Sequence, residues 1–298
     1  MRMKTCFSLL IGLLAAVFAV SQARAASPVT LSKVVVALKP DKNPDAMFAE
    51  REKLSEYLSA RLGKPVEVIV PLSAAVILEG LNNGSIDFAY LSATDMLNAM
   101  NQKSATILLA GEIDGKTSYE SYWVTLKEKP YQSIAELKGK PIAFASKTST
   151  SGYVIPLWDL RKKNLISDSG KAEEFFGEGN VWFGSGYVSA VERVLNGDAE
   201  AAAVSDYVFD KDKHLTAEQR QRLRTLARQG PVPTHIIAIR SSISEKDKGA
   251  LREVLLAMDK EDPELRDRVF TSPLVEVDAS VHFGSLAESI ALARRASE

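Results

Sequence analysis

The chain has 298 residues, of which 46% are hydrophobic and 25% charged, which is enough material for two modest globular domains. Its 37 basic and 38 acidic residues nearly balance, so it lacks the basic excess typical of nucleic-acid-binding proteins. The three histidines are widely spaced and form no metal-binding pattern such as HExxH. We therefore expect no cofactor, no metal site and no nucleic-acid partner.

The first 25 residues have the pattern of a secretory signal peptide. Arg2 and Lys4 precede an apolar run at 7–20, and residues 23–25 (Ala-Arg-Ala) form an A-x-A cleavage site. The apolar run is too short for a membrane span. The single cysteine, Cys6, would leave with the signal, which excludes cysteine-based catalysis in the mature chain. We predict export to the periplasm.

The first half of the mature chain alternates strands with helices. Residues 33–38 are apolar and largely β-branched, which predicts a buried strand. A helical face follows and ends at Gly63, and residues 65–70 predict a second strand. This β-α-β unit favours a mostly parallel sheet. The next predicted elements are a helix through 76–81, a strand at 86–91, a helix from 95, and strands at 106–110 and 119–126.

The second half repeats this alternation and ends in helices. The two extended segments 119–126 and 230–240 are the places where the chain could pass between lobes. One lobe inserted in another through two such strands suits hinge closure around a ligand. The predicted elements are strands at 142–145, 222–227 and 235–240, a stiff break at 230–234, and helices at 189–195, 245–258, 263–269 and 285–293.

The most informative stretch is Ser149-Thr150-Ser151-Gly152, between a predicted strand and a predicted helix. The first N–H groups of a helix have no partner inside it and lie at the positive end of its dipole. Hydroxyls add donors, and glycine lets an anion approach the backbone. The stretch predicts a site for a small tetrahedral oxyanion, with an ordinary Ser/Thr helix cap as the alternative. Pro156 cannot donate a helical hydrogen bond, which predicts an irregular first turn.

Several segments resemble the phosphate, phosphite and phosphonate substrate-binding proteins of ABC transporters (PhnD-like proteins). They are residues 137–144 (Leu-Lys-Gly-Lys-Pro-Ile-Ala-Phe) with the Ser-Thr-Ser-Gly turn, residues 84–91 (Gly-x-Ile-Asp-Phe-Ala-Tyr-Leu), and residues 194–197 leading into 203–206. The resemblance implies a type II periplasmic-binding fold, with two α/β lobes, a two-strand hinge and a ligand cleft between the lobes. The expected division is a signal peptide at 1–25, a first lobe at 26–121 plus 230–298, and an inserted second lobe at 122–229.

The resemblance also implies roles for individual residues. The hydroxyl-rich turn would bind the anion, Tyr90 would close over it from the other lobe, and Asp206 would hydrogen-bond a protonated oxygen or a ligand amine. Tyr187 and Ser205 stand where family members often have other residues. Packing of the two tyrosines and helix capping by Asp206 are the alternatives. The predicted ligand-binding set is Ser149, Thr150, Ser151, Gly152, Tyr90, Asp206, Tyr187 and Ser205.

The function implied by the resemblance is capture of a phosphorus oxyanion by a monomeric receptor that delivers it to an inner-membrane permease. A sensor or accessory protein of the same fold is an alternative. An exported hydrolase with Ser149 or Ser151 as nucleophile is less favoured, because the stretch has no G-x-S-x-G or S-x-x-K motif and histidines are scarce. We expect no enzymatic activity.

Overall fold

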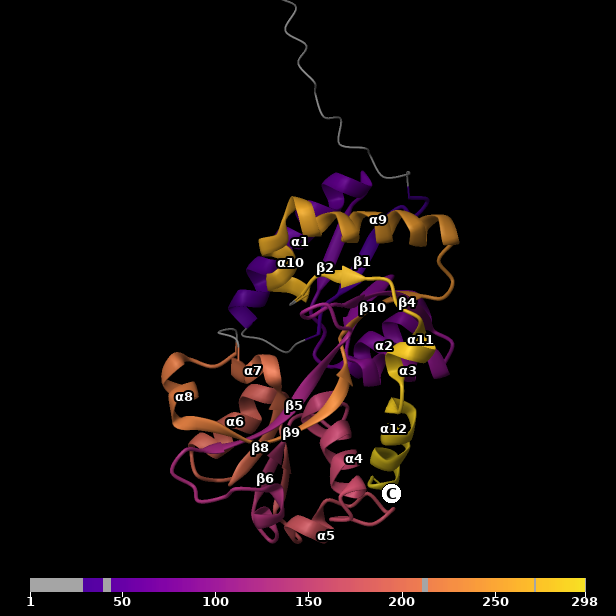
Figure 1. The fold of residues 1–298 in the computed structure, drawn as a ribbon. Coiled ribbons are helices and arrows are strands. Elements are labelled where there is room, and N and C mark those ends of the chain that lie inside the picture. Colours follow the sequence, from indigo (N-terminus) through magenta and orange to yellow (C-terminus); the bar gives the residue numbers. More distant parts are fainter. Residues whose placement is uncertain (1–28, 40–43, 211–213, 271, 298) are drawn as a thin grey trace, which may run out of the picture.

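The structure is a computed structural model that describes residues 29–39, 44–210, 214–270 and 272–297. The predicted signal peptide at 1–25 lies outside these residues. The described chain forms two α/β lobes, each built on one sheet (Figure 1). Within the described ranges, none of the helices is both long and apolar enough to cross a membrane.

The six-stranded lobe has the strand order β11-β4-β10-β3-β1-β2. β1, β2 and β3 are parallel, and β10 runs antiparallel to β3 and β4. Its strands are β1 (Val34–Ala37), β2 (Val66–Ile69), β3 (Phe88–Leu91), β4 (Ala105–Gly111), β10 (Ile236–Arg240) and β11 (Leu274–Val275). Its helices are α1 (Pro44–Leu62), α2 (Ala74–Asn83), α3 (Ala93–Asn101), α9 (Glu245–Glu261) and α10 (Pro263–Phe270).

The five-stranded lobe has the strand order β7-β6-β8-β5-β9. Its parallel part is β7, β6 and β8, and β5 runs antiparallel to both of its neighbours. Its strands are β5 (Ser118–Leu126), β6 (Ile142–Phe144), β7 (Val181–Phe183), β8 (Ala201–Ser205) and β9 (Leu223–Pro233). Its helices are η1 (Ile134–Leu137), η2 (Thr150–Val154), α4 (Ile155–Lys162), α5 (Glu173–Phe176), α6 (Tyr187–Leu195), α7 (Asp206–Asp210) and α8 (Ala217–Arg222).

Two hydrophobic cores hold these layers together. One contains Leu54, Phe88 and Phe270 and packs α1, α9 and α10 on the six-stranded sheet. The other extends from α2 and α3 into the five-stranded lobe, where Trp123 lies 5.4 Å from Phe144 between ring centroids. Central strands buried on both faces explain the continuous apolar runs from which they were predicted.

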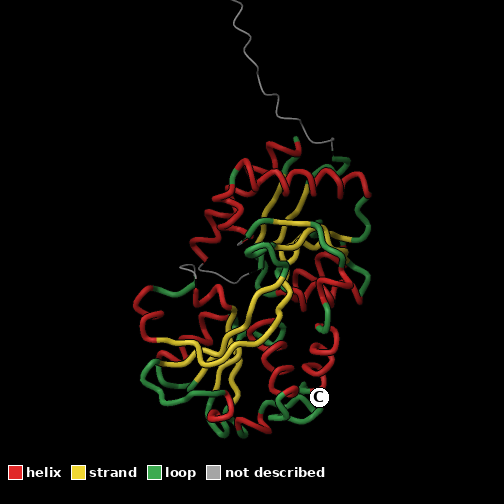
Figure 2. Tube along the Cα trace, in the orientation of Figure 1, coloured by secondary structure: helices red, strands yellow, loops and turns green. Residues whose placement is uncertain are grey.

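The antiparallel pair β5 and β9 connects the two lobes (Figure 2). The break predicted at 230–234 is wrong, because β9 continues to Pro233, which pairs with Ser118. β9 is an edge strand, and a proline costs little pairing where the neighbouring side of the strand is open. The boundaries predicted at 121/122 and 229/230 fall inside these two strands and stay a prediction.

The C-terminal helices α11 (Ala279–Phe283) and α12 (Leu286–Arg295) return toward the five-stranded lobe. α12 packs on α4 and also contacts α3 (Figure 1). The Arg294 guanidinium donates to the side-chain oxygen of Asn98 at 2.7 Å, and Arg295 donates to the carbonyl of Asp168 at 2.9 Å. This helix is therefore a third link between the lobes, beside the two strands.

Leu292 of α12 is fully buried, and its carbonyl and side chain pack on Gly170. Leu292→Ala should lower the free energy of unfolding by about 2–5 kcal/mol, through lost burial and the cavity left behind. Urea unfolding of the mature wild-type and variant chains measures this difference in free energy. Val281→Ala is the control, since Val281 is 81% exposed and should change stability by less than about 0.5 kcal/mol. Equal effects of the two changes would contradict the packing of α12.

Candidate functional site

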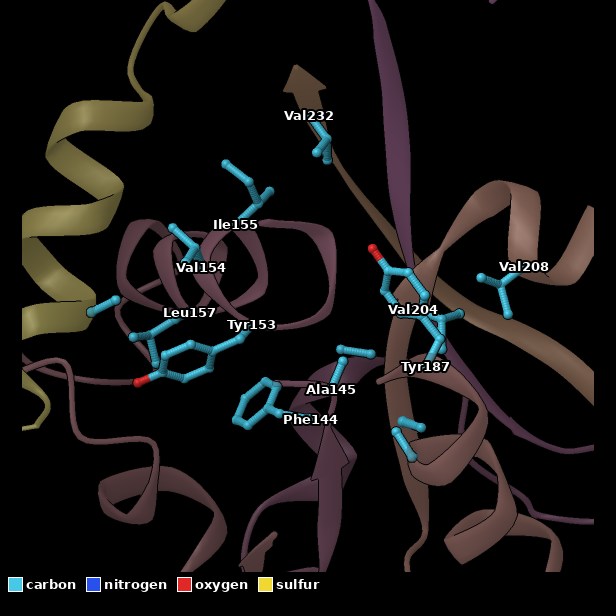
Figure 3. Packing of buried hydrophobic residues seen from close by; sticks show 14 of the residues in the cluster. Phe144, Ala145, Tyr153, Val154, Ile155, Leu157, Tyr187, Val204, Val208 and Val232 are labelled. Carbon is cyan, nitrogen blue, oxygen red and sulfur yellow. The ribbon is translucent and has the colours of Figure 1, made fainter. Parts of the chain in front are cut away.

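The hydroxyl-rich turn connects β6 to η2. Within it, Gly152 lies close to Ala145 and Ser149. Ser149 is the N-cap, and its Oγ accepts the N–H of Gly152 at 3.1 Å. A Cβ on Gly152 would lie 2.5 Å from the Cβ of Ala145 and 2.7 Å from Ser149 Oγ. Figure 3 shows the apolar side chains packed at this turn, among them Phe144 and Tyr187. The predicted helix cap is confirmed for Ser149.

The irregular start predicted from Pro156 is also confirmed, because η2 is a single π-helical stretch that continues into α4. Proline has no N–H, so carbonyl groups of the preceding turn need other donors. The carbonyl of Ser151 accepts the Ser121 hydroxyl at 2.6 Å, and the carbonyl of Gly152 accepts the N–H of Ala145 at 3.1 Å. π-helical turns are frequent at functional sites.

Ser151 is fully buried at the centre of a hydroxyl network. Its Oγ lies 2.7 Å from the hydroxyl of Tyr187, the first residue of α6, and accepts a hydrogen bond from the Tyr119 hydroxyl at 3.2 Å. Burial raises the pKa of Tyr119 well above its ordinary value, so this phenol stays protonated. The structure thus places the hydroxyls of Ser151 and Tyr187 in contact, and their predicted role in ligand binding stays a prediction.

Thr150 links the turn to the other lobe. Its Oγ1 accepts the N–H of Thr94, in the first turn of α3, at 3.2 Å, and the two threonine hydroxyls lie 2.9 Å apart. Residues from the first turns of α3, η2 and α6 therefore meet, and each helix contributes the positive end of its dipole. Within the described chain, the N–H groups of Thr150 and Ser151 donate to no other group. Open donors and convergent dipoles favour an anion here.

The charge balance near this point includes one ion pair. The buried carboxylate of Asp95 accepts the Ser92 hydroxyl at 2.6 Å and lies 3.8 Å from the Nζ of Lys39. Ser92 in turn accepts the N–H of Asp95, and so caps α3. A carboxylate in the first turn already offsets the dipole of α3.

Tyr90 is held by contacts within its own lobe. Its hydroxyl donates to the carbonyl of Phe270 at 2.6 Å, and its ring stacks on His235 at 5.2 Å between centroids. These contacts correspond to the packing alternative. The predicted contact of Tyr90 with a ligand stays a prediction.

Asp206 and Ser205 lie at the carboxyl end of β8, beside β5. The Asp206 carboxylate accepts the N–H groups of Tyr207 at 2.6 Å and Glu120 at 3.0 Å, and the Ser205 hydroxyl at 3.3 Å. Burial nevertheless raises the pKa of Asp206 above its ordinary value, against the lowering effect of these hydrogen bonds. These hydrogen bonds tie the start of α7 to β5, and the predicted ligand contact of Asp206 stays a prediction.

Three residues that the predicted set omitted lie at the same place. Tyr119 and Thr94 bond the turn directly, and His235 stacks between Tyr90 and Tyr119. Thr94 follows strand β3, and its place at the carboxyl end of a parallel strand was a usable signal. Among the described residues, no group of three His, Cys, Asp or Glu side chains could hold a metal ion.

The sequence matches a family profile described as "ABC transporter, phosphonate, periplasmic substrate-binding protein" over residues 36–281. The chain belongs to this family. Its fold is accordingly that of a type II periplasmic binding protein, and the family consists of substrate-binding proteins of ABC transporters.

Among curated proteins, this family member is similar to the phosphate-import protein PhnD of Mycolicibacterium smegmatis. The two are 26% identical over 185 residues, which cover 60% of the chain and 56% of the relative. The match thus spans little more than half of the relative's length.

Solved structures share the fold at lower identity. PhnD1 of Prochlorococcus marinus, in complex with methylphosphonate, is 18% identical with a TM-score of 0.77, covering 89% of this chain and 99% of that one. A Xanthomonas citri protein bound to ATP is 19% identical with a TM-score of 0.73, covering 90% and 100%. The two bound ligands differ, so the shared architecture alone does not name the ligand of this family member.

Gly152→Ala should disrupt the turn, because the added Cβ meets Ala145 and Ser149 at less than 3.0 Å. We expect a loss of about 1–3 kcal/mol of unfolding free energy from overpacking. Gly249→Ala is the matched control, since the helical Gly249 has nothing within 4 Å of the new Cβ and should gain up to about 1 kcal/mol. Urea unfolding of both variants measures the contrast, and a neutral Gly152→Ala would refute the close contact.

Stability should also depend on the titration of His235. Burial lowers its pKa from 6.5 to about 3, and the Lys39 charge acts in the same direction. Between these values the unfolded chain binds the proton and the folded chain does not. The free energy of unfolding should therefore fall as pH falls from 6.5 toward 3, by up to ~1.4 kcal/mol per pH unit from this group. His235→Phe should weaken the pH dependence of the unfolding free energy, measured by urea titrations at pH 4–7. If the wild-type and variant free energies change with pH in parallel, the low pKa of His235 is contradicted.

Proposed function

We propose that the protein is the periplasmic solute receptor of an ABC transporter that captures a small phosphorus oxyanion. The candidate ligands are a phosphonate, phosphite or phosphate. The observation that supports this best is the meeting of three helix N-termini at Thr150 and Ser151, where two backbone N–H groups are open. Family membership, a relative that imports phosphate and a structural neighbour with methylphosphonate point to the same ligand class.

The affinity would come from donors that are already in place before the ligand arrives. Hydrogen bonds to a charged oxyanion are stronger than neutral ones, and burial removes the competing water. The hydroxyls of Ser151, Tyr187 and Tyr119 already form one network. Because their positions are fixed by the strands and helices that contain them, binding orders few side chains.

The same network argues against the hydrolase alternative. A serine nucleophile needs a base within hydrogen-bond reach. Among the described residues, the side-chain partners of the Ser151 Oγ are two phenols, and Tyr119 stays protonated because burial raises its pKa. The Ser149 Oγ accepts the N–H of Gly152 as a helix cap. These hydrogen bonds of Ser149 and Ser151 fit a role in ligand binding and do not fit that of a catalytic nucleophile.

The division into lobes is part of the proposal. Residues 26–121 plus 230–298 would form one lobe and 122–229 the other, with β5 and β9 bending between them. The Thr94–Thr150 hydrogen bonds join the lobes directly and would belong to the closed state. The monomeric receptor, exported by cleavage of residues 1–25, would then present its ligand to an inner-membrane permease.

Calorimetry on the mature chain tests the ligand class with methylphosphonate, phosphite, phosphate and sulfate. We expect at least one phosphorus oxyanion to bind with a submicromolar Kd. Ser151→Ala should weaken that binding about 10- to 100-fold, because one hydrogen bond to a charged group is worth about 1.5–3 kcal/mol.

Ser85→Ala is the control for this series. Ser85 is exposed in the turn between α2 and β3, so the change should leave the Kd unaltered. A folded wild-type chain that binds none of the four anions would overturn the proposal. Equal Kd values for Ser151→Ala and Ser85→Ala would instead show that the Ser151 hydroxyl does not contribute to binding.

A further inference from the structure

His235 occupies a fixed position beside the N-terminus of α3. It immediately precedes β10, whose Ile236 pairs with Leu91 of β3, so His235 lies next to Ser92, the cap of α3. Its backbone carbonyl accepts the N–H of Gly111 at 2.9 Å. Strand pairing on both sides therefore determines where the imidazole can lie.

Aromatic rings from both lobes surround this imidazole. Tyr90 of β3 stacks on it at 5.2 Å, Tyr119 of β5 stacks at 6.3 Å, and Tyr207 of α7 meets it edge-on at 6.2 Å. Tyr119 also donates to Ser151. His235 is thus one side chain away from the hydroxyl-rich turn, on the opposite lobe.

The imidazole of His235 makes no hydrogen bond with a described residue, and the side chain is 6% exposed. Its nitrogens are not among the fully buried atoms that lack a partner, so they keep access to solvent. His282, the other buried histidine, places its Nε2 3.2 Å from the carbonyl of Thr234. The Nδ1 of His282 is buried without a partner, whereas the nitrogens of His235 can be reached from solvent and hence by a ligand.

The imidazole is uncharged at neutral pH. Burial, with smaller contributions from the charges of Lys39 and His214, lowers its pKa to about 3. The other titratable groups that face it are the phenols of Tyr90, Tyr119 and Tyr207. A neutral imidazole still donates through one nitrogen and accepts through the other. It can therefore bind an oxygen without adding a charge to the site.

We propose that His235 contacts the ligand directly and donates a hydrogen bond to an oxygen of the bound oxyanion, from the lobe opposite the Ser149–Gly152 turn. This inference rests on the proposed function. It makes the six-stranded lobe an active part of ligand recognition, and it assigns to the stacked tyrosines the role of orienting the imidazole.

The test distinguishes hydrogen bonding by the imidazole nitrogens from stacking of the ring. His235→Phe keeps the flat ring and its stacking but removes both nitrogens, whereas His235→Gln restores a hydrogen-bonding group. Calorimetry with methylphosphonate and with phosphate should show a Kd about tenfold or more higher for the phenylalanine variant, partly recovered by glutamine. A Phe variant with the wild-type Kd for both anions overturns the inference while leaving the proposed function intact. A wild-type chain that binds neither anion overturns both.

A second measurement on the wild-type chain covers the case in which a variant does not fold. The imidazole nitrogens of His235 and His282 can be followed by ¹⁵N NMR during titration with the same two anions. We expect a larger shift for His235 than for His282, whose Nε2 already has a partner. Bound anion with an unchanged His235 signal would contradict the contact.

Discussion

The close approach of η2 to the end of β6 is the constraint on which the rest of the site depends. There is no room for a side chain at position 152, because a Cβ there would meet Ala145 and Ser149. This close packing holds the start of η2 in place. That start determines where the N–H groups of Thr150 and Ser151 lie. It also sets the distance from Ser151 to Tyr187, and hence the meeting of η2 with α6.

The turn is also connected to both strands that join the lobes. The carbonyl of Ser151, left without a helical donor by Pro156, accepts the Ser121 hydroxyl of β5 at 2.6 Å. Ser121 Oγ accepts the side-chain amide of Gln229 in β9 at 2.7 Å. A change of twist in this strand pair would move the carbonyl of Ser151, and with it the open N–H groups. Under the proposed function, these two hydrogen bonds would couple ligand binding to lobe movement.

The sequence predicted the elements whose signals are local. The apolar run before the turn, the Ser149 cap and the effect of Pro156 were all readable, because each depends on neighbours within a few residues. The course of β9 was not, since tolerance of its prolines depends on the edge position of the strand. Tyr119 and His235 were missed for a similar reason, because their ring contacts join residues more than 100 positions apart. The fold class could be predicted; the aromatic surroundings of the site could not.

The electrostatics at the Ser149–Gly152 turn favour one class of ligand under the proposed function. Three helix N-termini meet at one place, and their dipoles repel one another unless negative charge lies nearby. Asp95 supplies that charge for α3, but Lys39 lies 3.8 Å from its carboxylate and reduces the effect. A low His235 pKa keeps the imidazole from adding a further positive charge. The remaining positive potential is at η2 and α6, whose first turns contain hydroxyl donors and no acidic residue. Under the proposed function, an anion rich in acceptor oxygens would complement that end of the site better than a neutral or cationic solute.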